Sequence, residues 1–286
     1  MKNLKKPNFN NIDRFKEIAT SKNIDRREKL LSLMHIVIRR YEEYEMKFQI
    51  GNDLSEISKK SWNIEYENVL KHCYKSNTGG LDKLKKDIKK AQDNNVCQYC
   101  GIIPTSKTFD HYLPKSDFPE YSVLADNLIP CCYECNIKKG DKWVENGRRQ
   151  ILHLYFDEIP KERFLFAEVR YENQKVIVNF KLENNAQIEE EKFEIIKAHY
   201  ESLSLMSRFK EQVNEVVSSI RSSIKYSGIK NFRFEKIKKL IKNKARAKQD
   251  KEGINSWEGA IIEKLAESED FIEDCRTIIN ENEVNK

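Results

Sequence analysis

The sequence predicts an α+β protein that is mainly α-helical, with a compact module of short strands and turns between two helical flanks. Three observations predict this class. Apolar residues recur at helical spacing in both flanks, which is typical of amphipathic helices. That period disappears from Cys97 to about Lys142, where prolines recur. Residues 163–182 instead alternate apolar and polar side chains, as a β-hairpin does.

The N-terminal flank, residues 1–94, is predicted to be helical. Two shorter patterns predict a helix near 55–75 and a short basic helix over 81–91. The strongest pattern predicts one long core helix over 25–48, because its apolar residues fall at steps of four and three along one stripe. That stripe consists of Leu30, Met34, Val37, Tyr41, Tyr44 and Phe48.

The central module is expected to occupy residues 95–145, and the C-terminal region residues 146–286. The hairpin over 163–182 turns at a short polar stretch, 172–175. Three or four helices are then predicted from about residue 189 to the end, because apolar residues again recur at helical spacing.

Composition indicates a charge-rich globular protein and argues against a membrane partner. Hydrophobic residues make up 39% and charged residues 34% of 286 residues, without the bias of a disordered chain. The most apolar run, residues 30–38, is too short to cross a bilayer. The basic N-terminus has no apolar segment behind it, so no signal peptide is indicated. We therefore expect a cytoplasmic protein.

The net charge of +6 is unevenly distributed. Residues 225–251 hold eleven basic and two acidic residues, whereas residues 252–286 hold ten acidic and three basic residues. Two interpretations stand. The first is a polyanion-binding helix followed by an acidic segment that offsets its charge, and the second is two neighbouring helices whose solvated faces pair.

The cysteines predict a metal site. Of seven cysteines, five lie between residues 97 and 135, and the other two, Cys73 and Cys275, have the apolar helical neighbours of buried thiols. Two C-x-x-C pairs can supply the four ligands that tetrahedral Zn²⁺ takes in a closed structural site. The predicted ligands are Cys97, Cys100, Cys132 and Cys135.

Cys131 is a second candidate beside Cys132. We prefer Cys132 as the ligand because its two-residue gap to Cys135 matches the gap of the first pair. Cys131 would then be buried or spare. A structural zinc suits this module, since a unit of about 45 residues has too small a core to fold alone.

The module also carries polar residues that zinc does not explain. The pattern "CQYC…DHYLPKS…NLIPCCYECNIKKGD" resembles the HNH endonucleases, the zinc-stapled form of the ββα-metal nuclease fold. The resemblance covers residues 97–142. It implies that His111 is the general base for phosphodiester hydrolysis and that Asn127 fixes the loop that aims this histidine. It further implies that Asp110 and Asn136 bind a catalytic metal ion.

One residue differs from the histidine–asparagine–histidine pattern that gives the family its name. Asn136 stands where a second histidine would be expected, and its carbonyl oxygen suits a hard cation. The catalytic ion is therefore expected to be Mg²⁺ or Mn²⁺, and Zn²⁺ or Ni²⁺ should support cleavage less well.

Basic residues around the motif are candidates for binding the phosphates that flank the cut. These are Lys115, Lys138, Lys139 and Lys142, with Arg148 and Arg149 beyond them. Such contacts give affinity but little sequence information, and no helix that would read a groove is recognisable. We therefore expect double-stranded DNA as the substrate with little sequence specificity, while RNA stays an alternative because the site reads a phosphodiester.

The resemblance also bears on biological context. HNH proteins with large helical flanks often serve as effectors of bacterial anti-phage or restriction systems, and Septu-type systems pair an ATPase with an HNH protein. A regulatory ATPase partner is therefore expected by analogy. The competing interpretation is a non-catalytic zinc-stabilised module that binds nucleic acid or a partner protein, although such a module would not need His111.

Overall fold

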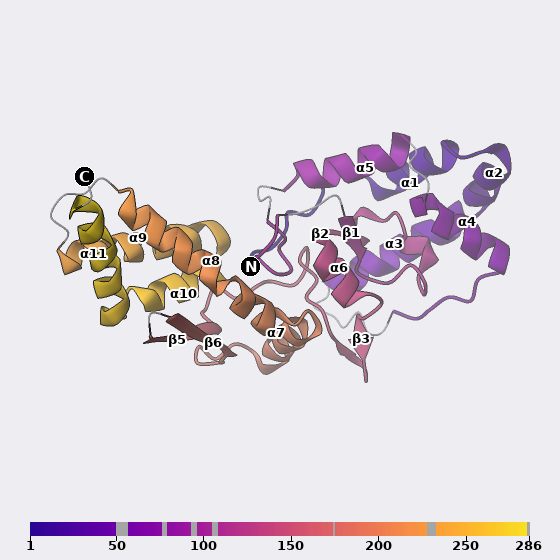
Figure 1. Ribbon diagram of the computed structural model, residues 1–286. Helices are drawn as coiled ribbons and strands as arrows, with labels where there is room; N and C mark the ends of the chain where they lie inside the picture. Colours follow the sequence, from indigo (N-terminus) through magenta and orange to yellow (C-terminus); the bar gives the residue numbers. More distant parts are fainter. Residues whose placement is uncertain are drawn as a thin grey trace. The chain divides into compact units, whose positions relative to one another are not determined.

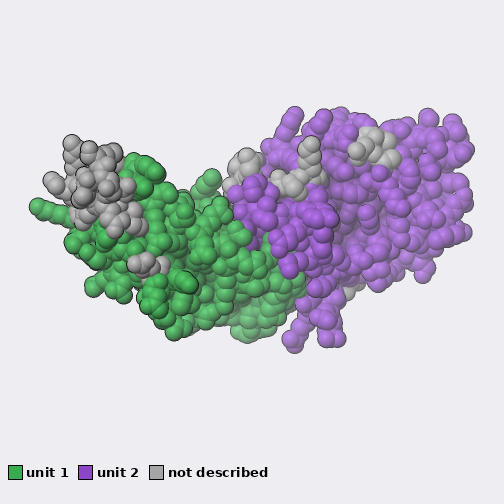
Figure 2. All heavy atoms as spheres, in the orientation of Figure 1, with its two compact units in different colours: residues 1–2, 159–286 green, residues 3–158 purple. Residues whose placement is uncertain are grey.

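The computed structural model confirms a mainly helical α+β fold (Figure 1). It describes residues 1–49, 57–75, 79–92, 96–104, 108–173, 175–227 and 233–284. Within these ranges the chain forms eleven α-helices and three antiparallel two-stranded sheets. It divides into two compact units, residues 3–158 and residues 1–2 with 159–286 (Figure 2).

The first unit, residues 3–158, contains five helices before the module and one within it. The bounds of the helices are α1 Asn11–Thr20, α2 Ile24–Ser32, α3 Met34–Gln49, α4 Ile64–Lys75, α5 Gly79–Lys90 and α6 Tyr133–Lys139. The strands are β1 Thr108–His111, β2 Leu128–Cys131, β3 Val144–Glu145 and β4 Arg148–Arg149, and the short 3-10 helices are η2 Pro119–Tyr121 and η3 Ala125–Asn127.

The long helix predicted over 25–48 is two helices, so that prediction was wrong. The chain leaves the helical path at Leu33, between α2 and α3. Just before the break, the Ser32 hydroxyl donates to the Lys29 carbonyl at 2.8 Å. A serine hydroxyl that bonds to a backbone carbonyl of the preceding turn offers the backbone an alternative to the regular helix. The stripe still stays buried, since Leu30, Val37 and Tyr44 are in the core.

The helix predicted near 55–75 begins later than expected, at Ile64. Residues 57–63 are not helical, and residues 55–56 lie outside the described residues. The start is set by Asn63, whose side-chain oxygen accepts from the Glu65 amide at 2.9 Å, as an N-cap asparagine does. The basic helix predicted over 81–91 is confirmed as α5.

The module has the expected strand, strand, helix order. β1 and β2 pair antiparallel, with Asp110 opposite Ile129 and His111 opposite Leu128. The helix α6 follows β2 directly and packs against β1 (Figure 1). The segment between the strands is compact and buried, and contains η2 and η3.

The second unit contains the predicted hairpin, β5 Leu165–Glu172 and β6 Lys175–Leu182. Gln174 in its turn lies outside the described residues. Five helices follow where three or four were predicted, because the chain after α9 forms two helices, α10 and α11. They are α7 Glu190–Ser202, α8 Leu205–Lys225, α9 Phe234–Glu252, α10 Trp257–Leu265 and α11 Glu269–Val284.

The basic and acidic segments fall on neighbouring helices of this unit. α9 packs against α10 and α11, and the Lys248 ammonium of α9 lies 2.8 Å from a Glu258 carboxylate oxygen of α10. The interpretation that the two charged faces pair is therefore confirmed for this contact; residues 228–232 of the basic segment lie outside the described residues. In the described part of the chain, no helix is long and apolar enough to span a bilayer.

Candidate active site

The two C-x-x-C pairs converge, as predicted. The Sγ atoms of Cys97, Cys100, Cys132 and Cys135 all lie within 4.8 Å of one another, and all four residues are buried. Cys132 is also the N-cap of α6, where its sulfur accepts from the Cys135 amide at 3.5 Å. The cluster therefore ties the turn after Cys97 to the first turn of α6.

The spacing of these sulfurs suits a tetrahedral zinc ion. Zn–S bonds of about 2.3 Å place the ligand sulfurs of a tetrahedron about 3.8 Å apart, and the Cys100 and Cys132 sulfurs are 3.9 Å apart. Thiolates are the form of cysteine that binds metal. The four residues are thus consistent with a structural zinc site.

The remaining cysteines are buried outside this cluster. Cys131 is fully buried in β2, where burial raises the pKa of its thiol. Cys73 in α4 and Cys275 in α11 are also buried, and the expectation that they fill the core is confirmed.

His111 stands at the end of β1 with one ring nitrogen fixed. Its Nε2 lies 3.0 Å from the Ser122 carbonyl oxygen. Because a carbonyl only accepts, Nε2 carries the proton and the neutral ring leaves its Nδ1 lone pair available. Burial, followed by the charge of Lys115, lowers the pKa of His111 to about 3, so the ring is neutral near pH 7.

The Ser122 carbonyl is itself held in place by buried contacts. The Ser122 hydroxyl donates to the Leu70 carbonyl of α4 at 2.9 Å. Just before it, the fully buried Glu120 accepts from Arg40 at 2.8 Å and from the Trp62 indole at 3.0 Å. The N-terminal helices therefore fix the segment that orients His111.

Asn127 has the geometry expected of a residue that fixes the loop after His111. Its side chain is fully buried. Oδ1 accepts from the Leu113 amide at 2.7 Å and from the Tyr44 hydroxyl at 3.1 Å. Nδ2 donates to the carbonyls of Leu113 at 3.0 Å and Tyr121 at 3.2 Å. The four bonds thus occupy the amide, three with the segment that follows His111 and one with Tyr44 of α3.

Asp110 points to a different set of partners from its neighbour His111. The Asp110 carboxylate lies 3.0 Å from the Lys139 ammonium and accepts from the Tyr99 hydroxyl at 3.0 Å. Asp110 is 2% exposed and Lys139 is 0% exposed. Burial raises the pKa of Asp110, and Lys139 opposes that shift.

The second proposed metal ligand, Asn136, lies on α6 one turn before Lys139. Asn136 is half-buried, and Lys139, one turn further along α6, reaches Asp110 of β1. A carboxylate oxygen and an amide oxygen are ligands that Mg²⁺ takes. Asp110 retains lone pairs beyond its two bonds, so the donor chemistry fits a hard cation.

The structure separates the four predicted phosphate-binding lysines. Lys115 and Lys138 are half-buried and Lys142 is exposed. Lys139 is fully buried, and its ammonium also donates to the His111 carbonyl at 2.8 Å. The surface position expected for Lys139 is therefore corrected: this ammonium serves an internal carboxylate. Likewise, Arg149 makes two 2.9 Å bonds to the Asp157 carboxylate.

The inward position of Lys139 had a signal in the sequence. Cys135 and Lys139 are four residues apart on α6, so they share a face, and Cys135 is held in the buried cysteine cluster.

Two further neighbours of His111 could not be predicted from the spacing of residues in the sequence. The Tyr74 ring of α4 lies edge-on to the His111 ring, with centroids 4.3 Å apart, and Lys85 of α5 contacts that tyrosine.

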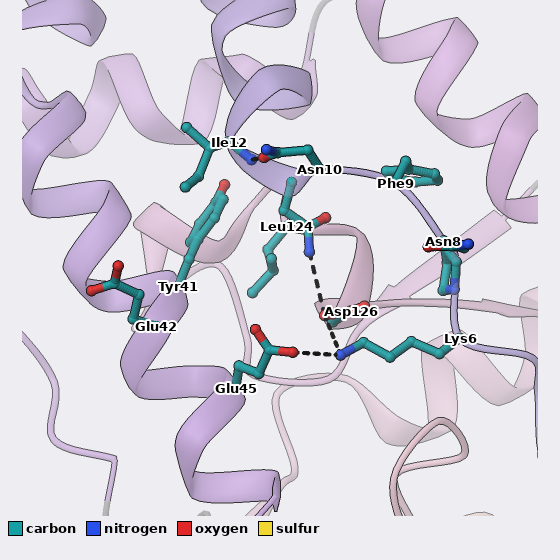
Figure 3. A pocket seen from close by; sticks show the side chains of 12 residues that line it. Lys6, Asn8, Phe9, Asn10, Ile12, Tyr41, Glu42, Glu45, Leu124 and Asp126 are labelled. Carbon is teal, nitrogen blue, oxygen red and sulfur yellow. Dashed lines mark hydrogen bonds and ion pairs between the residues drawn. The ribbon is translucent and has the colours of Figure 1, made fainter.

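A cavity lies between the N-terminal segment, α3 and the residues just before Asn127 (Figure 3). Its volume is about 630 Å³, and Tyr41, Glu45 and Asp126 are among its lining residues. Lys6 lies between two of these acids, 3.0 Å from Glu45 and 3.5 Å from Asp126. Because Asp126 precedes Asn127 in η3, this ion pair holds the residue next to Asn127.

The strand pair, the histidine at its edge, the cysteine cluster and α6 are the parts of a ββα-metal nuclease module. Residues 97–142 match the family model described as HNH endonuclease. The chain therefore contains an HNH endonuclease domain.

Two curated proteins show how far the similarity extends. The chain is 27% identical to protein ea31 of Escherichia phage lambda over 216 residues, which are 71% of this chain and 73% of that protein. It is 43% identical to the Septu protein PtuB of Bacillus thuringiensis over 51 residues, which are 16% of this chain and 20% of PtuB. No solved structure matches the chain.

Proposed function

We propose that the chain is a metal-dependent endonuclease that hydrolyses phosphodiester bonds in double-stranded DNA with little intrinsic sequence specificity. One observation supports this most directly. His111 is a neutral histidine whose Nε2–H is held on the Ser122 carbonyl, which leaves Nδ1 able to accept a proton, and it lies in an HNH endonuclease domain.

Each residue of the site has a role in this proposal. His111 Nδ1 takes a proton from the attacking water. Asn127 positions the histidine through its bonds to Leu113 and Tyr121. Asp110 and Asn136 hold Mg²⁺ or Mn²⁺, which when bound stabilises negative charge on the phosphate and the leaving oxygen.

The other predicted residues hold the frame and the substrate. The cysteine quartet binds a structural Zn²⁺ and keeps α6 against β1. Lys115, Lys138 and Lys142 neutralise phosphates next to the cut. Lys139 balances the buried charge of Asp110, to which it is bonded at 3.0 Å.

We further propose that this nuclease is an effector of an anti-phage defence or restriction system, under the control of a partner protein such as an ATPase. The local similarity to a Septu protein supports this assignment. The experiment is cleavage of plasmid DNA in the presence and absence of the candidate partner.

The nuclease activity is tested with His111→Ala. Supercoiled plasmid is incubated with Mg²⁺ or Mn²⁺, and open-circular and linear products are measured. We expect cleavage by the wild type, slower cleavage with Ni²⁺, and loss of cleavage in the variant with its zinc content unchanged. His35→Ala is the control, because His35 is an exposed histidine of α3 and its loss should leave the rate unchanged.

Three other results would change the proposal. Equal cleavage by His111→Ala and wild type would remove the histidine from the mechanism. Cleavage of RNA in place of plasmid would change the substrate class. Zinc-loaded wild type that binds DNA and cuts nothing, even with its partner, would favour a non-catalytic binding module.

A further inference from the structure

Two lysines beside the candidate general base come from different parts of the chain and meet on one aromatic ring. The Lys85 ammonium of α5 lies 4.3 Å from the centroid of the Tyr74 ring, and the Lys115 ammonium lies 5.4 Å from it. The same ring contacts His111 at 4.3 Å between centroids. Tyr74 and Lys85 both lie outside the residues that match the HNH family, 97–142.

Neither ammonium has a carboxylate partner at ion-pair distance among the described residues, unlike two other lysines of α4 and α5. Lys71 pairs with Glu67, and Lys83 pairs with Glu17. The nearest acids, Asp82 and Asp141, act on Lys85 and Lys115 only as charges.

Both lysines also lie where the surroundings disfavour the charged form of the ammonium group. Both are half-buried, and burial lowers the pKa of each ammonium, with Lys115 adding to the shift at Lys85 and Lys75 adding to the shift at Lys115. Crowded cations of this kind are stabilised by an anion. The fully buried Lys139 is occupied by Asp110, whereas the half-buried Lys85 and Lys115 are cations beside His111 that can face a substrate.

We propose that Lys85 and Lys115 form a phosphate clamp that holds the DNA backbone against His111, with Tyr74 as the positioning residue that sets the histidine and both ammonium groups. The proposal rests on the nuclease function proposed above and extends its substrate site beyond the HNH motif to helices α4 and α5. Ammonium groups at fixed positions bind phosphate oxygens and stabilise charge that develops during transfer.

Binding and cleavage of a labelled DNA duplex by the full-length protein test the clamp separately. Binding is measured at several salt concentrations without added divalent metal. Lys85→Ala and Lys115→Ala should each reduce the slope of log affinity against log salt by about 1. Each should also slow cleavage about tenfold or more once Mg²⁺ is added. Lys85→Arg keeps the charge and should retain most of both properties.

Tyr74 is tested by a different readout. Tyr74→Leu should leave the salt slope unchanged and slow the single-turnover rate at saturating DNA by up to about 100-fold, because the reacting groups are misplaced. Tyr74→Phe keeps the ring and should retain the rate. Lys86→Ala is the matched control, since Lys86 is the next residue of α5 and is exposed.

The outcomes separate this inference from the proposed function. If Lys85→Ala and Lys115→Ala behave like Lys86→Ala while His111→Ala abolishes cleavage, the clamp is wrong and the nuclease stands. If the wild type cuts nothing but the two lysine variants lose salt-dependent binding, the clamp stands as a DNA-binding surface and the nuclease is wrong. An equal loss with Lys86→Ala would indicate diffuse electrostatic binding and overturn the clamp.

Discussion

At the scale of single residues, the buried ion pair of Asp110 and Lys139 decides how charge is arranged at the site. The Asp110 carboxylate lies 3.0 Å from the Lys139 ammonium, and both side chains are almost fully removed from solvent. An isolated buried carboxylate is strongly disfavoured. Lys139 therefore keeps Asp110 compatible with the ionised form that a metal ligand needs.

We predict that Lys139→Met is strongly destabilising. Removing one partner of a buried pair leaves the other charge uncompensated, which typically costs about 3–5 kcal/mol. The free energy of unfolding, measured by urea denaturation of the zinc-loaded protein, should fall by this amount. Lys138→Met is the control, because Lys138 is the half-buried neighbour on α6. Equal stability of the two variants would argue against the buried pair.

Protonation of the His153 ring bears on stability, because this ring contacts Tyr44, a partner of Asn127. It is fully buried, and its Nε2 lies 2.9 Å from the Tyr44 hydroxyl, which in turn donates to Asn127. Burial, followed by the charge of Arg149, lowers the pKa of His153 well below its usual value. The folded protein therefore holds His153 neutral, whereas the unfolded chain protonates it below about pH 6.5.

We predict that this histidine makes the protein less stable in acid. Below about pH 6.5 the unfolded state binds a proton that the folded state excludes, so the free energy of unfolding falls by up to about 1.4 kcal/mol per pH unit. Urea denaturation at pH 7.5 and pH 5.5 should show a smaller pH dependence in His153→Gln than in the wild type. His35→Gln, at an exposed position, should keep the wild-type dependence, and an unchanged slope in His153→Gln would contradict the prediction.

At the scale of elements, α4 links the helical flank to the site. It begins at the Asn63 cap and carries Leu70, which accepts from Ser122, and Tyr74, which contacts His111. The start of this helix therefore helps to set the position of the candidate base.

We predict that Asn63→Ala lowers the free energy of unfolding by about 1 kcal/mol, the usual cost of losing an N-cap side chain. Asn63→Asp should retain most of the stability, because its carboxylate can accept the same bond from the Glu65 amide, which is 2.9 Å from the Asn63 side-chain oxygen. The measurement is the urea midpoint at constant slope. Equal losses in the two variants would show that the cap does not stabilise α4.

Elements whose signal is local were predictable from the sequence, and those set by packing were not. The cysteine quartet and the hairpin follow from spacing and alternation, and α6 follows from the resemblance to the ββα-metal fold. The break at Leu33, next to the Ser32 hydroxyl bond, is not revealed by the apolar period. The contacts of Tyr74 and Lys85 with the site arise from the packing of helices distant in sequence.

At the scale of the whole molecule, the two compact units differ in what holds them together. In the second unit, β5 of the hairpin packs against α10 and β6 packs against α8. The first contains strands β1 and β2 of four residues each and the seven-residue α6. Elements this short are not stable alone, so we expect the cysteine-bound zinc to hold the module.

We therefore predict that zinc removal unfolds the module of the first unit and spares the second unit. Structural zinc contributes about 10–16 kcal/mol of apparent binding free energy. Tryptophan fluorescence distinguishes the units, because Trp62 and Trp143 lie in residues 3–158 and Trp257 lies in the other unit, stacked on Phe209 with ring centroids 5.3 Å apart. A strong zinc chelator should shift the thermal transition of a Trp257→Phe variant strongly to lower temperature.

The matched variant, Trp62→Phe with Trp143→Phe, reports only on Trp257 and should melt at the same temperature with and without chelator. Restoring Zn²⁺ should recover the transition of the first unit, and metal analysis should give one zinc per chain for the four cysteines. A chelator that shifts both reporters equally would mean that the units unfold together. A chelator that shifts neither would mean that buried apolar contacts hold the module without metal.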